Sequence, residues 1–289
     1  MGVVNITPDS FSDGGLFFDP EAAVARAMQL LDEGADLLDL GAESTRPGSW
    51  AGSSFAGPAP SSPAPVVSAD EEQARLLPVL ESILKARPEA IISVDTYKAA
   101  TAQAALACGA EIVNDVSGLF WDSGLGSVCA EAGCGVVLMH TRGRPHEWAA
   151  QAQLAPDELL KTVQSGLQAS LDRAAAVGIA PESIVLDPGY GFGKRGEENF
   201  ALLARQVELL ALGRPLLAGV SRKSFLGHVL APLYAGKPAS VEARETASLA
   251  AMVTAILNGA AIVRVHRVRA AVEAALVVDA VRAHRREQD

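Results

Sequence analysis

Short apolar runs alternate along the chain with longer stretches in which apolar residues recur every three or four positions. The runs lie at residues 3–4, 37–40, 91–94, 111–113, 135–139, 184–186, 216–220 and 261–265. Because apolar residues within most runs follow one another without polar interruption, the runs predict strands that are buried on both faces. That pattern is typical of a parallel sheet covered by helices.

The stretches between the runs predict helices at about 20–33, 69–86, 99–107, 125–132, 156–177, 197–211, 241–257 and 269–285. Asp19 precedes Pro20 as an N-cap precedes the first helical residue, and Gly34 and Gly178 follow predicted helix ends. Eight strand–helix pairs in fewer than 300 residues favour an α/β fold of the (β/α)8 or TIM-barrel type. A doubly wound open sheet is the alternative, although no predicted strand is followed by a GxGxxG turn.

Residues 49–68 interrupt this pattern with SWAGSSFAGPAPSSPAPVVS, a stretch rich in Pro, Ala, Ser and Gly. We interpret it as a loop insertion, because the residues before it complete only one strand–helix unit and a second strand. The sequence therefore predicts a single barrel domain over residues 1–289. The first predicted strand begins almost at Met1, so we expect nothing before it to cover the bottom of the barrel.

Composition narrows the class of protein. The chain has 289 residues, of which 49% are hydrophobic and 20% charged, as in a soluble globular protein. Its net charge of -10 argues against nucleic acid or an anionic membrane as the main partner. Cys108, Cys129 and Cys134 form no CxxC pair, so we expect buried thiols in a reducing compartment. The chain shows no signal peptide or membrane span, and we expect a cytoplasmic location.

Polar residues stand at the C-terminal ends of nearly all the predicted strands. In chain order they are Asn5, Asp39 with Glu43, Asp95, Asn114 with Asp115, His140, Asp187, Ser221 to Lys223, and Arg264 with His266. In a (β/α)8 barrel these ends meet at one rim, where active sites lie. A structural role is equally plausible for each residue alone: His140 reads as a structural histidine, and Asp39 and Asp115 could pair with neighbouring cations. Together they predict a functional site, since burying unpaired charges is costly.

The chemistry of this rim divides into two parts. Asp95, Asn114 and Asp187 offer acceptors that suit the N–H edge of a flat heterocycle, and Lys223 adds a donor. Arg264 and His266, with the N-terminus of the helix that follows them, suit an anion. Arg46 would supply a second cation. Asn5 could share a Mg²⁺ ion with a substrate pyrophosphate, because Mg²⁺ commonly takes one or two protein oxygens and phosphate oxygens.

Several segments resemble those of the dihydropteroate synthase family. The most specific are TPDSFSDGG (7–15), GAESTRPG (41–48), LDPGYGFGK (186–194) and SRKS (221–224), with further matches in SVDT (93–96), NDVSG (114–118), LMH (138–140) and RVH (264–266). The resemblance touches all eight strand–helix units. It implies the condensation of 6-hydroxymethyl-7,8-dihydropterin pyrophosphate with p-aminobenzoate, which gives dihydropteroate and pyrophosphate for folate synthesis. It also implies a homodimer and competition by sulfonamides.

The resemblance also implies a role for each matched residue. Asp95, Asn114, Asp187 and Lys223 would hold the pterin, and Asn5 would meet the Mg²⁺ ion. Arg46, Arg264 and His266 would bind pyrophosphate and, with Lys223, carry the catalysis. Phe11, Thr45, Pro47, Phe192 and Ser224 would shape the p-aminobenzoate site. Pyrophosphate would depart first, and the arylamine would attack the resulting pterin-methylene cation.

Two positions depart from the family pattern. Ala42 stands where the family usually has Gly, and Arg267 stands where it usually has Asp. Arg267 and the early start leave a second hypothesis open, a paralogue that binds pterin without catalysis. The retention of the residues assigned to pyrophosphate and p-aminobenzoate argues against it. A pterin-dependent methyltransferase is a third hypothesis, which the SRKS and ESTRPG segments disfavour because such an enzyme has no pyrophosphate to stabilise.

Overall fold

The computed structural model describes residues 1–7, 19–43 and 67–286. Eight parallel strands form one sheet in the order β1 to β8. They are β1 Gly2–Asn5, β2 Leu37–Gly41, β3 Ile91–Asp95, β4 Ile112–Asp115, β5 Gly135–Met139, β6 Ile184–Asp187, β7 Leu216–Ala218 and β8 Ala260–Val263. The predicted loop insertion at 49–68 lies outside the described residues except for Val67 and Ser68.

The first and last strands close the sheet into a barrel. Gly2 and Val265 form a parallel bridge, and the Val3 amide donates to the Val265 carbonyl at 3.0 Å. The Val265 amide in turn donates to the Met1 carbonyl at 3.0 Å. Because the strand order is sequential and the ends are joined, the (β/α)8 prediction is confirmed and the open sheet is wrong.

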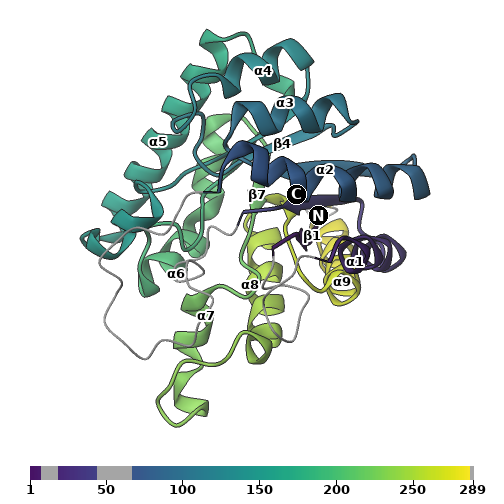
Figure 1. Ribbon diagram of the computed structural model, residues 1–289. Helices are drawn as coiled ribbons and strands as arrows, with labels where there is room; N and C mark the ends of the chain where they lie inside the picture. The colour runs from purple at the N-terminus through teal and green to yellow at the C-terminus, as the bar shows by residue number, and fades with distance from the viewer. Residues whose placement is uncertain (8–18, 44–66, 287–289) are drawn as a thin grey trace.

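Helices surround the strands (Figure 1). They are α1 Pro20–Asp32, α2 Ala69–Ala86, α3 Ala99–Ala107, α4 Leu125–Ala132, α5 Pro156–Ala176, α6 Gly196–Arg205, α7 Ser224–Val229, α8 Glu245–Leu257 and α9 Val268–Arg286. Asp19 caps α1 as predicted, since its carboxylate accepts from the amides of Glu21 and Ala22. In the described part of the chain, none of these helices is long and apolar enough to cross a membrane.

Short 3₁₀ turns supplement the helices, at η2 Pro145–Ala150, η3 Pro181–Ser183, η4 Gln206–Leu212, η5 Ala231–Leu233 and η6 Glu242–Arg244. One α-helix was predicted at 197–211, but α6 ends at Arg205 and the chain continues as the 3₁₀ turn η4. There the fully buried Gln206 amide donates to the carbonyls of Ala255 and Asn258, which ties η4 to α8. The sequence did not reveal α7, because six residues are too few to show a helical period. The segment that follows α7 projects at the bottom of Figure 1.

The two faces of the strands bury different kinds of residue. Outward side chains such as Leu38, Ile92 and Val94 pack against the helices in the main apolar core. Inward side chains form layers: Met1, Val137 and Leu217 make an apolar layer at the bottom. The alternation of strand side chains places Asp39 and Asn114 above that layer, inside the barrel and below the rim. The barrel interior is thus polar where it approaches the predicted site.

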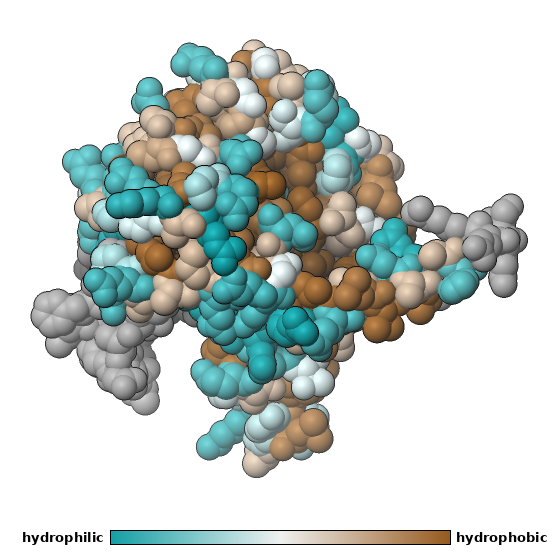
Figure 2. Space-filling model, turned by 90° about the vertical axis from the view of Figure 1, so that its right-hand side faces the viewer, coloured by the Kyte–Doolittle hydropathy of each residue, from teal (hydrophilic) through white to brown (hydrophobic). Residues whose placement is uncertain are grey.

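The outer surface mixes polar and apolar side chains on the side that carries α1 and α9 (Figure 2). Leu276 and Val277 of α9 are exposed.

The three cysteines are free thiols. Cys129 and Cys134 are buried, as predicted, whereas Cys108 is only half-buried.

Candidate active site

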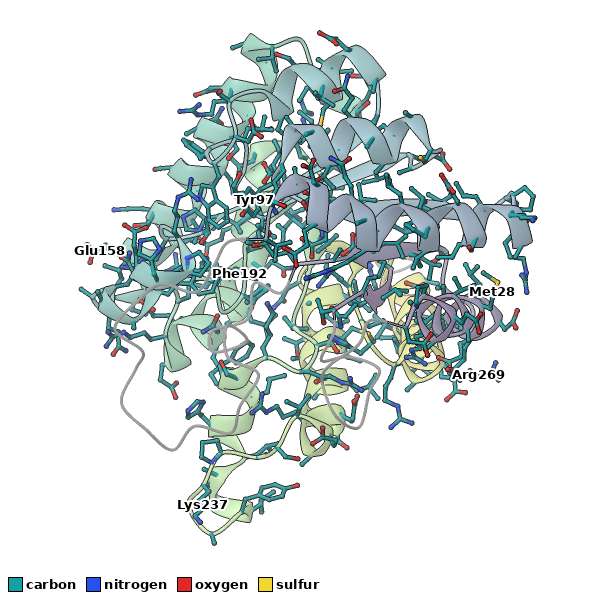
Figure 3. All side chains as sticks on the ribbon, in the orientation of Figure 1. Met28, Tyr97, Glu158, Phe192, Lys237 and Arg269 are labelled. Atoms are coloured by element: carbon teal, nitrogen blue, oxygen red, sulfur yellow. The ribbon has the colours of Figure 1, made fainter. Side chains whose placement is uncertain are left out.

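A cavity of about 380 Å³ opens at the C-terminal ends of the strands. Nine residues that the sequence placed at the strand ends or in the substrate sites line it: Asn5, Glu43, Asp95, Phe192, Ser221, Lys223, Ser224, Arg264 and His266. Gly41 and Gly219 line it with their backbone, next to the side chains of Glu43 and Ser221 from the same two strand ends. Phe192 lies near the centre of the molecule in Figure 3. The structure therefore brings together residues that are up to 261 positions apart, from Asn5 to His266.

An ion network joins two residues of the cavity lining, Asp95 and Arg264, to Asp39 inside the barrel. The Arg264 guanidinium donates to Asp39 at 2.5 Å and to Asp95 at 2.8 Å. Asp39 is fully buried and also accepts from Ser93 Oγ at 2.6 Å and Asn114 Nδ2 at 3.1 Å. The pairing of Asp39 with a cation agrees with the interpretation from the sequence. The same network shows that Arg264, expected at an anion, is held between two carboxylates.

Two carboxylates are arranged to receive donors from a ligand. Asp95 lines the cavity with 16% of its side chain exposed, and burial raises its pKa to about 7 although Arg264 opposes the shift. Burial also raises the pKa of Asp187, whose Oδ1 accepts from the Gly189 amide at 2.7 Å. A Cβ atom at Gly219 would lie 3.8 Å from Asp187 Oδ2, so glycine leaves space above this oxygen. Ionised carboxylates in such surroundings gain most from added N–H donors.

The loop after β6 is held by its lysine. The Lys194 ammonium is buried and donates to the carbonyls of Gly189 at 2.9 Å, His140 at 3.2 Å and Phe192 at 3.3 Å. Burial lowers the Lys194 pKa to about 7. Asn199 accepts from the Gly191 amide at 2.7 Å and donates to the Lys194 carbonyl at 3.0 Å. These bonds fix the backbone that presents Phe192, whose ring centroid lies 4.1 Å from Lys223 Nζ.

The SRKS segment forms a strained turn at the end of β7. Arg222 has a φ of 61°, which is unusual for a residue with a side chain. Its amide donates to Ser248 Oγ at 2.8 Å and its carbonyl accepts from Arg244 Nη1 at 3.1 Å. Its guanidinium pairs with Glu245 at 2.5 Å. Elements α8 and η6 therefore hold the turn that presents Lys223 and Ser224 to the cavity.

An acid–base cluster fixes the end of β2. Lys98 donates to Glu43 at 2.5 Å and to the buried Glu72 at 3.1 Å, and Thr101 also donates to Glu72 at 2.7 Å. Glu43 lines the cavity and directly precedes Ser44, Thr45 and Arg46, which lie outside the described residues. Thr45, Arg46 and Pro47, like Phe11, therefore stay predictions. The cluster holds the last described residue before them.

Other predicted residues lie away from the cavity lining. Asn114 and Asp187 are buried inside the barrel below it. His140 packs against α5, where a Cβ atom at Gly166 would come within 2.4 Å of its ring, which agrees with a structural role. The expected cation pairing of Asp115 is wrong: its carboxylate accepts from the amides of Ser117 and Leu119. These two amides shape the turn after β4.

Sequence reasoning did not single out Trp148, Val241 and Arg244, whose side chains also line the cavity. Trp148 of η2 and Arg244 of η6 both face the cavity. Trp148 is the single aromatic residue in the loop after β5, and that signal was available in the sequence. Arg244 follows the SRKS turn by 20 residues and carried no local signal. Among the described residues, no three His, Cys, Asp or Glu side chains are grouped to hold a metal ion.

Comparisons with known proteins agree with this geometry. A family model described as pterin binding enzyme matches residues 1–266. A dihydropteroate synthase of Mycobacterium leprae is 42% identical over 97% of this chain and 92% of its own length. A Xanthomonas albilineans dihydropteroate synthase solved with 4-aminobenzoic acid is 39% identical, with a TM-score of 0.83 over 98% of this chain and 92% of its own.

A second Xanthomonas albilineans structure, in complex with 7,8-dihydropteroate, is 36% identical with a TM-score of 0.80 over 98% of this chain and 92% of its own. The likeness extends over nearly the whole chain, and the named relatives are synthases, which favours catalysis over a paralogue that only binds pterin. The chain belongs to the pterin-binding enzyme family and, within it, to the dihydropteroate synthases.

Proposed function

We propose that this cavity joins 6-hydroxymethyl-7,8-dihydropterin pyrophosphate to p-aminobenzoate and releases dihydropteroate and pyrophosphate. The observation that carries the proposal is the set of groups gathered at the cavity. Asp95, Lys223, Ser221 and His266 line it, and the buried Asp187 lies in the barrel beneath the lining. A ligand with N–H donors at one end and an anion at the other fits this arrangement.

The pterin occupies the floor in this proposal. Its amino group and ring N–H donate to Asp95 and Asp187, which stay ionised more readily once these donors are in place. Asn114 is fixed by Asp39 and offers its remaining amide oxygen. Lys223 donates to a ring acceptor. The Arg264 guanidinium, bound by Asp39 and Asp95, places a fixed positive charge beside the floor.

The departing pyrophosphate lies at the rim, where His266 Nδ1 is 2.9 Å from Ser221 Oγ. His266, Arg264 and Arg46 would bind it, with Arg46 assigned by resemblance. Asn5 would hold a Mg²⁺ ion together with pyrophosphate oxygens. Its amide oxygen is the hard donor that Mg²⁺ prefers, and it lines the cavity at the end of β1. When bound, the ion would shield the charge that develops on the leaving group.

The arylamine then attacks the exocyclic carbon of the pterin from the side of the β6 and β7 loops. Phe192 and Ser224 contact p-aminobenzoate in this proposal, and Phe11, Thr45 and Pro47 complete its site by resemblance. The relative solved with 4-aminobenzoic acid supports this substrate. No side-chain nucleophile is required, because the carbon becomes electrophilic as pyrophosphate departs. Catalysis rests on electrostatic preorganisation at both ends of the pterin.

A purified-protein assay tests the proposal. Pterin pyrophosphate, p-aminobenzoate and Mg²⁺ are supplied, and dihydropteroate and pyrophosphate are followed. We expect product from the wild type and a loss of at least 100-fold in kcat/KM for Lys223→Ala. The matched control is Lys237→Ala, which removes an exposed lysine from the far tip of the α7–α8 segment (Figure 3). A folded wild type that binds pterin without forming product would refute the proposal.

We also propose a cytoplasmic homodimer in which each chain forms one domain with a loop insertion at 49–68. Val207 and Leu210 of η4 and Leu257 of α8 are exposed, and Gln206 joins these two elements. This apolar patch suits a second copy of the chain. Val207→Glu should therefore shift the sedimenting species to a monomer. Leu276→Glu on α9 serves as the control and should leave the assembly unchanged.

A further inference from the structure

Trp148 is locked in place although it stands in a loop. It belongs to η2, in the segment between β5 and α5, and only 7% of it is exposed. Its indole Nε1–H is shared between Thr141 Oγ1 and the Gly143 carbonyl, each at 3.1 Å. The buried indole N–H is therefore satisfied within its own loop, and the ring has a single orientation.

The ring of Trp148 packs against Phe192. Their centroids are 5.1 Å apart and their planes are inclined by 85°, the edge-to-face geometry that aromatic pairs favour. Phe192 also contacts Lys223, whose Nζ lies 4.1 Å from the ring centroid. All three residues line the cavity. Phe192 is thus held between an indole and an ammonium group that both border the same space.

The two loops that carry Trp148 and Phe192 are joined tightly. Arg142 donates to the Gly193 carbonyl at 3.2 Å and pairs with the buried Glu198 at 3.2 Å. A Cβ atom at Gly193 would lie 2.7 Å from Arg142 Cβ and 3.1 Å from Trp148 Cδ1. Because the backbone of one loop lies against the indole of the other, the aromatic wall cannot recede without separating the loops.

We propose that Trp148 is a specificity-determining residue, which forms with Phe192 the wall that limits the size of the arylamine substrate. The inference rests on the proposed function, in which the arylamine ring lies against Phe192. In this proposal the fixed wall accepts a single benzene ring, and the second ring of a fused bicyclic arylamine would collide with it. Discrimination by such a wall follows from its bulk and its fixed position.

Competing arylamines test this role. We would measure kcat/KM for p-aminobenzoate and for 4-amino-1-naphthoate, which is one fused ring larger, in wild type, Trp148→Ala and Trp148→Phe. In Trp148→Ala we expect the KM for p-aminobenzoate to rise about ten-fold and the preference for the naphthoate to rise at least 20-fold. Trp148→Phe keeps an aromatic edge against Phe192, so its preference for the naphthoate should lie between those of the wild type and Trp148→Ala. The KM for pterin pyrophosphate should change less than two-fold.

Trp121→Ala is the matched control. Trp121 packs against Tyr97 and lies beneath Arg144, which belongs to the same loop as Trp148, yet it does not line the cavity. Its replacement should leave the preference unchanged. Two results would overturn this inference and leave the proposed function intact. One is active, folded Trp148 variants that keep the wild-type preference for p-aminobenzoate over the naphthoate. The other is equal changes in the KM for p-aminobenzoate and the KM for pterin pyrophosphate. A wild type that forms no dihydropteroate would overturn the proposed function and this inference with it.

Discussion

Replacing Asp39 by Asn removes one negative charge from the ion network inside the barrel and changes little else in shape. The Asn side chain can still accept from Arg264 and donate to Ser93, whose oxygen lies 2.6 Å from the carboxylate. The substitution therefore removes only the negative charge of Asp39, the fully buried partner of Arg264. Removing one member of a buried ion pair costs about 3–5 kcal/mol, and Asp95 retains part of the pairing. We expect a loss of about 3 kcal/mol in the free energy of unfolding.

Urea unfolding followed by circular dichroism measures this loss. With a urea dependence near 3 kcal/mol per M, the midpoint should fall by about 1 M. Asp36→Asn is the control, because it removes the same charge from an exposed position next to the other end of β2. A midpoint that moves no more for Asp39→Asn than for Asp36→Asn would refute the reasoning.

We also expect Asp39→Asn to change the pH dependence of activity, because it changes the pKa of Asp95. The negative charge of Asp39 helps to raise the pKa of Asp95, and Arg264 lowers it. Without Asp39, the guanidinium acts on Asp95 with less competition, so the pKa of Asp95 should fall. The acid limb of kcat/KM for pterin pyrophosphate should then move to lower pH. A less stable enzyme that works at lower pH is a combination that general damage to the fold does not produce.

Three further predictions concern the site. In the wild type, Asp95 is protonated below its pKa of about 7, so kcat/KM for pterin pyrophosphate should fall as pH decreases from 7, by up to about ten-fold per unit, in a pH–rate profile. Asp187→Asn should weaken pterin binding at least ten-fold by calorimetry, and unchanged affinity would contradict the floor assignment. Lys98→Met should lower the unfolding free energy by about 3 kcal/mol in thermal unfolding, because Glu43 and Glu72 lose their buried counter-ion; an unchanged midpoint would show the cluster to be dispensable.

The fold was predictable from the sequence because its signals are local. Continuous apolar runs marked the strands, and Asp19, Pro20 and the closing glycines marked helix ends. Polar strand ends then followed from the barrel rule, which is why Asp95, Lys223 and His266 were found together. Short elements such as α7 escaped because they hold too few residues to show a period.

Pairings inside the site were not predictable in the same way. The ion pair of Arg264 with Asp39, 225 residues earlier, could not be predicted because the sequence does not show that both side chains point into the barrel at the same level. Trp148 stands out as the single aromatic residue of its loop, but its contact with Phe192, 44 positions away, could not be predicted from the sequence. Both cases depend on the register between distant strands and loops, which only the closed barrel defines. The roles of Phe11, Thr45, Arg46 and Pro47 rest on resemblance.

The charged layer inside the barrel bears on how the chain folds as it is synthesised. Asp39 and Asp95 belong to β2 and β3, whereas their counter-ion arrives with Arg264, 169 residues after Asp95. A nascent chain that ends before β8 holds two inward carboxylates without that cation, and burying them together is costly. The earlier strands should therefore keep their rim ends hydrated until β8 emerges. Barrel closure and charge neutralisation then occur in one cooperative step, so a fragment that lacks β8 should fail to form a stable intermediate.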